Sequence, residues 1–196
     1  STGNVVSAIP SNTTTYSVVG NSSNNCQSTS SITIYVNPLP SLTVNPNVST
    51  ICSDSTIIIN AMGANTYVWA PAIGLNTNIG ASVNANPAST SYYTVTGTDL
   101  NGCSNTASAT INVNPKPVVT LTTTPNTNSI CEGASLVIDA LGALNYSWQP
   151  SNGLNQTSGQ SVIASPISST NYIVVGTDQN NCKNTAEFML NVGINP

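Results

Sequence analysis

The stretch TVTGTDLNGC, residues Thr94–Cys103, occurs again as IVVGTDQNNC in residues Ile173–Cys182. A third and more diverged copy, SVVGNSSNNC, occupies residues Ser17–Cys26. Each copy opens with a stretch that contains β-branched residues and continues with Asp, Asn, Ser or Gly residues before a cysteine. β-Branched residues favour strands, and the small polar residues favour tight turns. The stretch therefore predicts a strand that ends in a hairpin turn, used three times in one chain.

Landmarks around this stretch recur at fixed spacing, so the chain is internally repetitive. A shift of 79 positions superimposes Cys52 on Cys131 without a gap. A shift of 77 positions superimposes Cys26 on Cys103, which brings the opening of the chain into the same register. We therefore predict three domains: residues 1–38 as the C-terminal half of a truncated repeat, 39–116 as a complete repeat and 117–196 as a second complete repeat.

Each complete repeat alternates short β-branched runs with turn residues. STIIINA (Ser55–Ala61) and SLVIDA (Ser135–Ala140) are such runs. In YYTVTG, a period of two places Tyr93, Val95 and Gly97 on one face. About seven strands in each repeat, without a sustained 3.6-residue period, predict tandem immunoglobulin-like β-sandwiches with little or no helix.

The linkers between the predicted domains are NPLP, residues 37–40, and NPKP, residues 114–117. Proline fixes φ and biases the residue before it toward extended conformations. We therefore expect semi-rigid joints between the repeats, which would make the chain a stiff spacer.

The five cysteines follow the repeat. Cys52 and Cys103 are 51 positions apart in one repeat, and Cys131 and Cys182 are 51 apart in the next. We predict that each pair forms a disulfide inside its own domain, which implies an oxidising, extracellular environment. Cys26 is the second cysteine of its repeat, so we predict that truncation leaves it unpaired. The chain has no Cys-x-x-Cys pair, so we expect no metal site built from these cysteines.

Asp99 and Asp178 admit two interpretations. An EF-hand calcium loop needs oxygen ligands at alternate positions, Gly at the sixth and a distant Glu. Here Gly102 follows Asp99 by three positions, and Ser22 occupies the equivalent position of the first repeat. Because Asp, Asn and Ser all bond nearby backbone N–H groups in turns, we favour a hairpin turn, with weak calcium binding at Asp99 and Asp178 as the alternative.

Aromatic residues recur in register. A Trp in the third strand of an immunoglobulin-like domain usually fills the core. The alternative is a sugar-stacking face formed by each Trp with Tyr67 or Tyr146. We predict four core aromatics: Trp69, Trp148, Tyr93 and Tyr172.

The charge composition excludes several classes of function. Only 4% of residues are charged, the net charge is −4 and two residues are basic, so binding to nucleic acid or to an anionic membrane is not expected. No apolar run is long enough to insert in a membrane. The chain has no His, which excludes Ser-His and Cys-His catalytic arrangements, and its six acids do not form a matching pair within a repeat. We expect neither enzymatic activity nor a cofactor.

The ordered motifs GANTYVWAPAIGL (63–75), PASTSYYTVTGTDLNGC (87–103) and VNPKP (113–117) resemble the repeat domains of giant cell-surface adhesins. Such adhesins belong to gliding and related Bacteroidota, the SprB type among them. The resemblance covers the whole chain and implies an immunoglobulin-like sandwich, exported by type IX secretion and displayed as a filament for adhesion and gliding motility. It also makes Ser55, in Asp-Ser-Thr, a candidate for O-glycosylation, with an unmodified serine as the alternative.

We therefore expect a structural repeat segment of an extracellular adhesin, acting as a spacer that presents an adhesive tip at the cell surface. Its partners would be neighbouring repeats of the same chain, and surface polysaccharide or substratum through other parts of the parent. Self-association into filaments is a further expectation, since a neighbouring chain could complete the half-domain of residues 1–38. The alternative is a carbohydrate-binding or spacer module array of a secreted polysaccharide-degrading protein.

Overall fold

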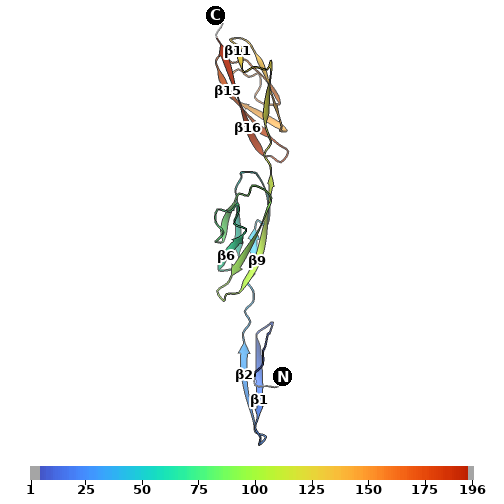
Figure 1. Ribbon diagram of the computed structural model, residues 1–196, viewed down its shortest axis with the longest axis vertical. Coiled ribbons are helices and arrows are strands. Elements are labelled where there is room, and N and C mark those ends of the chain that lie inside the picture. Colours follow the sequence, from blue (N-terminus) through green and yellow to red (C-terminus); the bar gives the residue numbers. More distant parts are fainter. Residues whose placement is uncertain (1–4, 194–196) are drawn as a thin grey trace. The chain divides into compact units, whose positions relative to one another are not determined.

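The computed structural model describes residues 5–193; residues 1–4 of the first predicted domain and 194–196 of the third lie outside the described part. Within this part the chain consists of strands and turns without a helix (Figure 1). No described helix is therefore available to cross a membrane. The strands are β1 (Thr14–Asn21), β2 (Gln27–Ile34), β3 (Thr43–Asn45), β4 (Val48–Cys52), β5 (Ile57–Met62), β6 (Thr66–Ala70), β7 (Ser82–Ala85), β8 (Ser91–Thr98), β9 (Ser104–Asn114), β10 (Thr120–Thr124), β11 (Ser129–Cys131), β12 (Leu136–Leu141), β13 (Asn145–Gln149), β14 (Ser161–Ala164), β15 (Thr170–Thr177) and β16 (Lys183–Gly193).

The strands form two-sheet sandwiches that follow the sequence repeat. In the second repeat a three-stranded sheet has the order β3-β5-β7, and a four-stranded sheet has the order β4-β9-β8-β6. The third repeat has the matching orders β10-β12-β14 and β11-β16-β15-β13. The first repeat contributes the hairpin β1-β2. Paired sheets of this order define an immunoglobulin-like sandwich, so the predicted fold class is confirmed.

Packing divides the chain into two compact units. The first comprises Ser1–Val48, Ile58–Ala85 and Tyr92–Thr110, and the second comprises Ser49–Ile57, Asn86–Ser91 and Ile111–Pro196. This division does not follow the three predicted domains. The boundaries after residues 38 and 116 stay a prediction, although each sheet draws its strands from a single predicted repeat.

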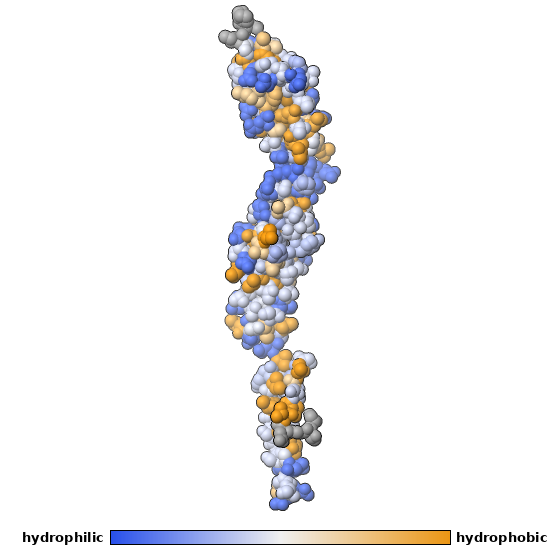
Figure 2. Space-filling view, in the orientation of Figure 1, coloured by the Kyte–Doolittle hydropathy of each residue, from blue (hydrophilic) through white to orange (hydrophobic). Residues whose placement is uncertain are grey.

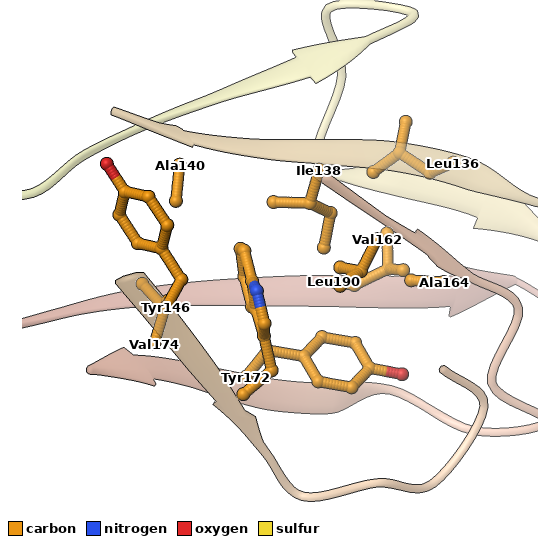
Figure 3. Packing of buried hydrophobic residues seen from close by; sticks show 10 residues of the cluster. Leu136, Ile138, Ala140, Tyr146, Val162, Ala164, Tyr172, Val174 and Leu190 are labelled. Carbon is orange, nitrogen blue, oxygen red and sulfur yellow. The ribbon is translucent and has the colours of Figure 1, made fainter. Parts of the chain in front are cut away.

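The core of the third repeat lies between its two sheets. Ile138 of β12 and Val162 of β14 come from one sheet, and Tyr172 and Val174 of β15 and Leu190 of β16 come from the other (Figure 3). All five are at most 1% exposed, and they alternate with outward-facing neighbours along their strands. Each buried side chain of this size stabilises the fold by about 1.5–3 kcal/mol.

Gly97 on β8 shows how closely this interior is packed. Tyr93, Val95 and Gly97 all face inward, as the period of two in the sequence predicts. A Cβ atom at Gly97 would lie 2.6 Å from Cδ1 of Leu42 and 2.8 Å from Cβ of Ala64. Glycine is therefore required here for volume, because no side chain fits between β8 and the chain that crosses it.

The hairpin β1-β2 carries the same pattern without the same burial. Tyr16 and Val18 are 39% and 64% exposed, whereas their equivalents Tyr93 and Val95 are fully buried. Tyr16 pairs with Ile32 across the hairpin, and Ile32 is 66% exposed. Apolar residues accordingly gather on the surface of this hairpin (Figure 2). The pattern is that of a core face, and the described residues of the first repeat supply no second sheet to cover it.

Candidate functional site: the cysteine turns and the disulfide

The turn between β8 and β9 is organised by the side chain of Asp99. Its Oδ1 accepts hydrogen bonds from the backbone N–H groups of Asn101 (2.9 Å) and Cys103 (2.8 Å). The N–H of Asp99 donates to the carbonyl of Cys103 at 2.9 Å, which closes the turn. Gly102 has a φ of 79° there, in the left-handed region that glycine adopts at little cost.

The turn between β15 and β16 repeats this geometry. Oδ1 of Asp178 accepts from the N–H groups of Asn180 (2.8 Å) and Cys182 (2.9 Å). In the first repeat Oγ of Ser22 accepts from the N–H of Cys26 at 3.1 Å. The carboxylates of Asp99 and Asp178 thus bond the turn backbone, which confirms the predicted hairpin turn. Among the described residues no group of three or more His, Cys, Asp or Glu is placed to hold a metal ion.

The cysteine pairing differs from the prediction. The structure contains a disulfide between Cys52, at the end of β4, and Cys182, in the β15–β16 turn, with Cα atoms 5.5 Å apart. Cys26, Cys103 and Cys131 are free thiols. The predicted bridges Cys52–Cys103 and Cys131–Cys182 are therefore wrong, and Cys26 is one of three unpaired cysteines. The observed bridge joins residues of two successive sequence repeats.

Strand length explains why a repeat cannot close its own bridge. In the third repeat Cys131 pairs with Gly193 at the end of β16, whereas Cys182 directly precedes Lys183 at the start of β16. The 11 residues of β16 separate the two positions. At about 3.3 Å per residue this is more than 30 Å, far beyond the 4.4–6.8 Å Cα separation of a disulfide. The two cysteines of one repeat lie at opposite ends of its last strand.

The second repeat has the same arrangement. The N–H of Ser53, next to Cys52, donates to the carbonyl of Asn114 at the end of β9. Cys103 directly precedes Ser104, the first residue of β9, which again has 11 residues. Cys52 therefore belongs to the end of its repeat that leads into the linker, and Cys103 to the opposite end.

The linker explains why Cys52 and Cys182 meet. The N–H of Lys116 donates to Oγ of Ser53 at 3.2 Å, and Nζ of Lys116 lies 3.0 Å from Oδ2 of Asp54. On the other side, Nδ2 of Asn184 donates to the carbonyl of Pro117 at 3.0 Å. All of these residues belong to the second compact unit. Ser53 and Asp54, which follow Cys52, thus contact Lys116 of the linker. Asn184, two positions after Cys182, contacts the next linker residue, Pro117.

Sequence reasoning missed these linker contacts. Asn105 and Asn184 are equivalent under the shift of 79, and Nδ2 of Asn105 donates to the carbonyl of Pro40 at 3.0 Å, as Asn184 does to Pro117. Pro40 and Pro117 are both buried. The recurrence of Asn two positions after the turn cysteine was the available signal. An asparagine at such a position can make several kinds of hydrogen bond, so the recurrence alone does not indicate a linker contact.

The two tryptophans are internal. Trp69 is 1% exposed, and its Nε1 donates to the carbonyl of Gly80 at 2.9 Å. Trp148 is 4% exposed and donates to the carbonyl of Gly159, also at 2.9 Å. The indole rings therefore offer neither a stacking face nor a free N–H to a sugar. Tyr67 and Tyr146, their proposed partners in a sugar-stacking face, are each 8% exposed.

The tyrosines of β8 and β15 are also internal. Tyr93 and Tyr172 are fully buried, and their hydroxyls donate to the carbonyls of Ile73 (2.9 Å) and Asn152 (2.6 Å). Burial raises the pKa of Tyr172, while the side-chain hydrogen bond of Thr170 lowers it to a smaller extent. Each hydroxyl ties a long loop back to the sheet, as a tyrosine corner does.

Ser55, the candidate O-glycosylation residue, is half-buried and lies two positions before β5. Its N–H donates to the carbonyl of Cys52 at 3.1 Å. Asp54, which precedes it, is exposed and has a φ of 63°. Modification of Ser55 stays a prediction.

Comparison with known proteins gives no family. No family model matches the chain, and no curated protein gives a significant sequence match. Among solved structures, the C-terminal 282-residue fragment of intimin, in complex with the intimin-binding domain of its translocated receptor Tir, is similar with TM-score 0.45 and 9% identity, over 79% of this chain and 64% of that one.

Two other solved structures illustrate the same level of likeness. A Ca²⁺-stabilised adhesin that helps an Antarctic bacterium bind ice has TM-score 0.41 and 11% identity, over 94% of this chain and 57% of that one. The extracellular cadherin domains 1–4 of protocadherin gamma B7 have TM-score 0.31 and 12% identity, over 93% of this chain and 58% of that one. The chain thus spans less than two thirds of each of the three structures. At these values the likeness says nothing about function.

Proposed function

We propose that this chain is a structural, non-catalytic repeat segment of an extracellular adhesin, and that it acts as a spacer presenting an adhesive tip. The parent would belong to the SprB-type surface adhesins of gliding and related Bacteroidota, exported by type IX secretion. The ordered motifs shared with those repeats support this assignment. The absence of His from the sequence supports a non-catalytic role, because the commonest nucleophile–base pairs need it.

The observation that carries the proposal is the disulfide Cys52–Cys182. It encloses most of the second repeat and most of the third in a covalent loop with a sequence separation of 130. Tension applied to the two ends of the chain passes from Cys52 to Cys182 through the sulfur atoms, so the residues inside the loop are shielded from it. A spacer under tension would benefit from such a bridge, because the bridge keeps the enclosed residues from being pulled apart.

An extracellular location at the cell surface fits the same bond. Disulfides persist in oxidising compartments and are rare in a reducing cytosol. The partners of the parent would be surface polysaccharide or substratum, bound through other parts of it, and the partners of this segment would be neighbouring repeats or further copies in a filament.

The rival role is a carbohydrate-binding module array of a secreted polysaccharide-degrading protein. Such modules stack exposed aromatic rings on sugars, and the burial of Trp69 and Trp148 opposes this use. A spacer role in a secreted polysaccharide-degrading protein is compatible with the same geometry. The sequence of the rest of the parent protein would distinguish that role from a spacer role in an adhesin.

Stretching the full chain between its termini tests the spacer role. In the oxidised chain, residues between Cys52 and Cys182 should not contribute to the extended length. Adding a thiol reductant should lengthen the extended chain by roughly 450 Å, the span of a 130-residue loop at about 3.5 Å per residue. An oxidised chain that already extends to the reduced length would contradict the proposal. A Cys131→Ser chain, which keeps the bridge, is the matched control.

A further inference from the structure

We propose that the free thiols Cys103 and Cys131 are docking sites for adjoining repeats of this same kind. Cys131 would bond the turn cysteine of a repeat that follows, and Cys103 the strand-end cysteine of a repeat that precedes. The disulfide Cys52–Cys182 is then one link of an overlapping series. This inference goes beyond the proposed function and does not rest on it.

Cys131 has the same backbone setting as Cys52, which is already bonded. The N–H of Glu132 donates to the carbonyl of Gly193 at 2.9 Å, as that of Ser53 donates to Asn114 at 2.8 Å. The residue three positions after each cysteine donates to the cysteine carbonyl, at 3.0 Å in the third repeat and 3.1 Å in the second. Cys131 therefore stands at the exit of its repeat as Cys52 does.

Cys103 has the same setting as Cys182, the other half of the bond. Both cysteine N–H groups donate to Oδ1 of the turn aspartate, at 2.8 Å for Cys103 and 2.9 Å for Cys182. Each is followed two positions later by an asparagine whose Nδ2 donates to the carbonyl of a linker proline at 3.0 Å. The same residues in the same setting thus form a disulfide in one place and are free thiols in the other.

The exposure of the thiols fits this assignment. Cys182, with its partner in place, is fully buried, whereas Cys103 is half-buried and Cys131 is exposed. Neither free thiol has a partner within its own repeat, because Cys52 and Cys182 are occupied and lie at the far end of an 11-residue strand. A disulfide partner for either thiol would therefore come from another repeat.

A series of such bridges has a mechanical consequence. Each bridge spans 130 positions, while successive repeats are 79 positions apart, as Cys52 and Cys131 are. Successive covalent loops therefore overlap, and at least one bridge spans every peptide bond within the series. A single proteolytic cut would leave such an array in one piece.

The bond forms by thiol–disulfide exchange with a small-molecule disulfide such as oxidised glutathione. One cysteine thiolate attacks the small disulfide and expels a glutathione thiolate, which leaves a mixed disulfide. The second cysteine then attacks this mixed disulfide and expels the second glutathione. The two cysteines lose two electrons and two protons, and the small disulfide becomes two glutathione thiols.

The test uses the full chain extended by one repeat. Residues 193–196 are replaced by the linker NPKP, and a second copy of residues 118–196 follows, which keeps the shift of 79. The protein is equilibrated with reduced and oxidised glutathione, its remaining thiols are alkylated, and peptides from a digest without reductant are identified by mass spectrometry.

We expect Cys131 to be linked to the turn cysteine of the appended copy, with alkylation of Cys131 about tenfold or more lower than in the chain without the extension. Cys52–Cys182 should persist in the same molecules, where it reports correct folding. An alkylated Cys131 beside an intact Cys52–Cys182 bridge would overturn the proposal.

A second variant separates the proposed pairing from pairing within a repeat. In a Cys52→Ser version of the extended chain, Cys182 loses its partner and should be found alkylated, while Cys131 keeps its link to the appended copy. A bridge between Cys131 and Cys182 in this variant would show that one repeat can close on itself, which also overturns the proposal. Loss of this pairing would leave the spacer role untouched, because the stretching experiment concerns Cys52–Cys182.

Discussion

Cys52 and Cys182 are 130 positions apart and form a disulfide, whereas Cys131 and Cys182, in the same sequence repeat, lie at opposite ends of one strand. The bond therefore connects one repeat with the next. In an isolated domain a disulfide only opposes unfolding of that domain. Here it also joins the chain before a linker to the chain after it.

Replacing either bonded cysteine should destabilise the protein. In the chain-entropy model, a disulfide that closes a loop with a sequence separation of 130 stabilises by about 5 kcal/mol. Urea unfolding of Cys52→Ser should show a loss of this order, and a reductant should have no further effect on it. The Cys131→Ser variant should unfold like the unchanged chain and respond fully to reductant. Equal losses in the two variants would contradict the pairing.

Trp148 should be a determinant of stability and should be insensitive to sugar. Truncation of this buried ring by Trp148→Ala should cost about 3–5 kcal/mol, whereas Tyr92→Ala, at a residue 71% exposed, should cost little. In the unchanged chain, iodide should quench the tryptophan fluorescence weakly, and soluble polysaccharide should not alter it. Strong quenching that polysaccharide prevents would favour the carbohydrate-binding alternative.

Asp178 should act through its turn rather than through calcium. Asp178→Ala removes the acceptor for two backbone N–H groups and should cost about 1–3 kcal/mol in thermal unfolding. Asp178→Asn keeps an acceptor oxygen and should recover most of that loss. Calcium at millimolar concentration should leave the Tm of the unchanged chain where it is. A rise in Tm with calcium that disappears in Asp178→Ala would establish the calcium interpretation instead.

Alkaline pH should destabilise the protein through Tyr172. Burial raises the pKa of Tyr172 above 10.0, so the folded chain holds this proton more tightly than the unfolded chain does. Stability from this group is fully present below pH 10.0 and falls as pH rises through the interval between the unfolded and folded pKa values. Urea midpoints measured from pH 8 to 12 should fall less steeply at the alkaline end for Tyr172→Phe than for Tyr92→Phe. Identical alkaline profiles would refute this role.

Gly97→Ala should be destabilising, and Gly20→Ala should not. A Cβ at Gly97 would be 2.6 Å from Leu42 and 2.8 Å from Ala64, and such overpacking costs about 1–3 kcal/mol. At Gly20, the equivalent position of the hairpin β1-β2, the nearest atom would be the carbonyl oxygen of Ser28 at 3.9 Å. Thermal unfolding of the two variants therefore compares equivalent positions of the repeat: Gly97 lies inside a two-sheet sandwich, and Gly20 lies in a hairpin without a second sheet. Similar midpoints would contradict the close packing around Gly97.

Much of the fold was predictable because it depends on local pattern. The period of two in YYTVTG predicts which residues of β8 face the core, and Tyr93 and Val95 are fully buried there. The Asp and Asn residues before Cys103 predict the turn, and the side chain of Asp99 accepts hydrogen bonds from backbone N–H groups within four positions of it. A repeat of these local signals is enough to define the number and kind of strands.

The candidate site was predictable only in part. The sequence identified the cysteines, and it identified their equivalence across repeats. The linker contacts of Lys116 and Asn184 were not predicted, because each joins residues more than 60 positions apart, beyond the range of a local sequence pattern. Equal spacing of cysteines in two repeats was compatible with more than one pairing.

The sequence by itself determined a β-sandwich repeat, its inward and outward faces and the chemistry of its turns, since these follow from side-chain alternation and short-range hydrogen bonds. Only the tertiary structure decided which sulfur atoms meet. The parallel pairing of β11 with the end of β16 places the two cysteines of one repeat at opposite ends of the strand. A disulfide requires two Cα atoms only a few ångströms apart. A cysteine therefore bonds the cysteine whose strand end lies at the same linker.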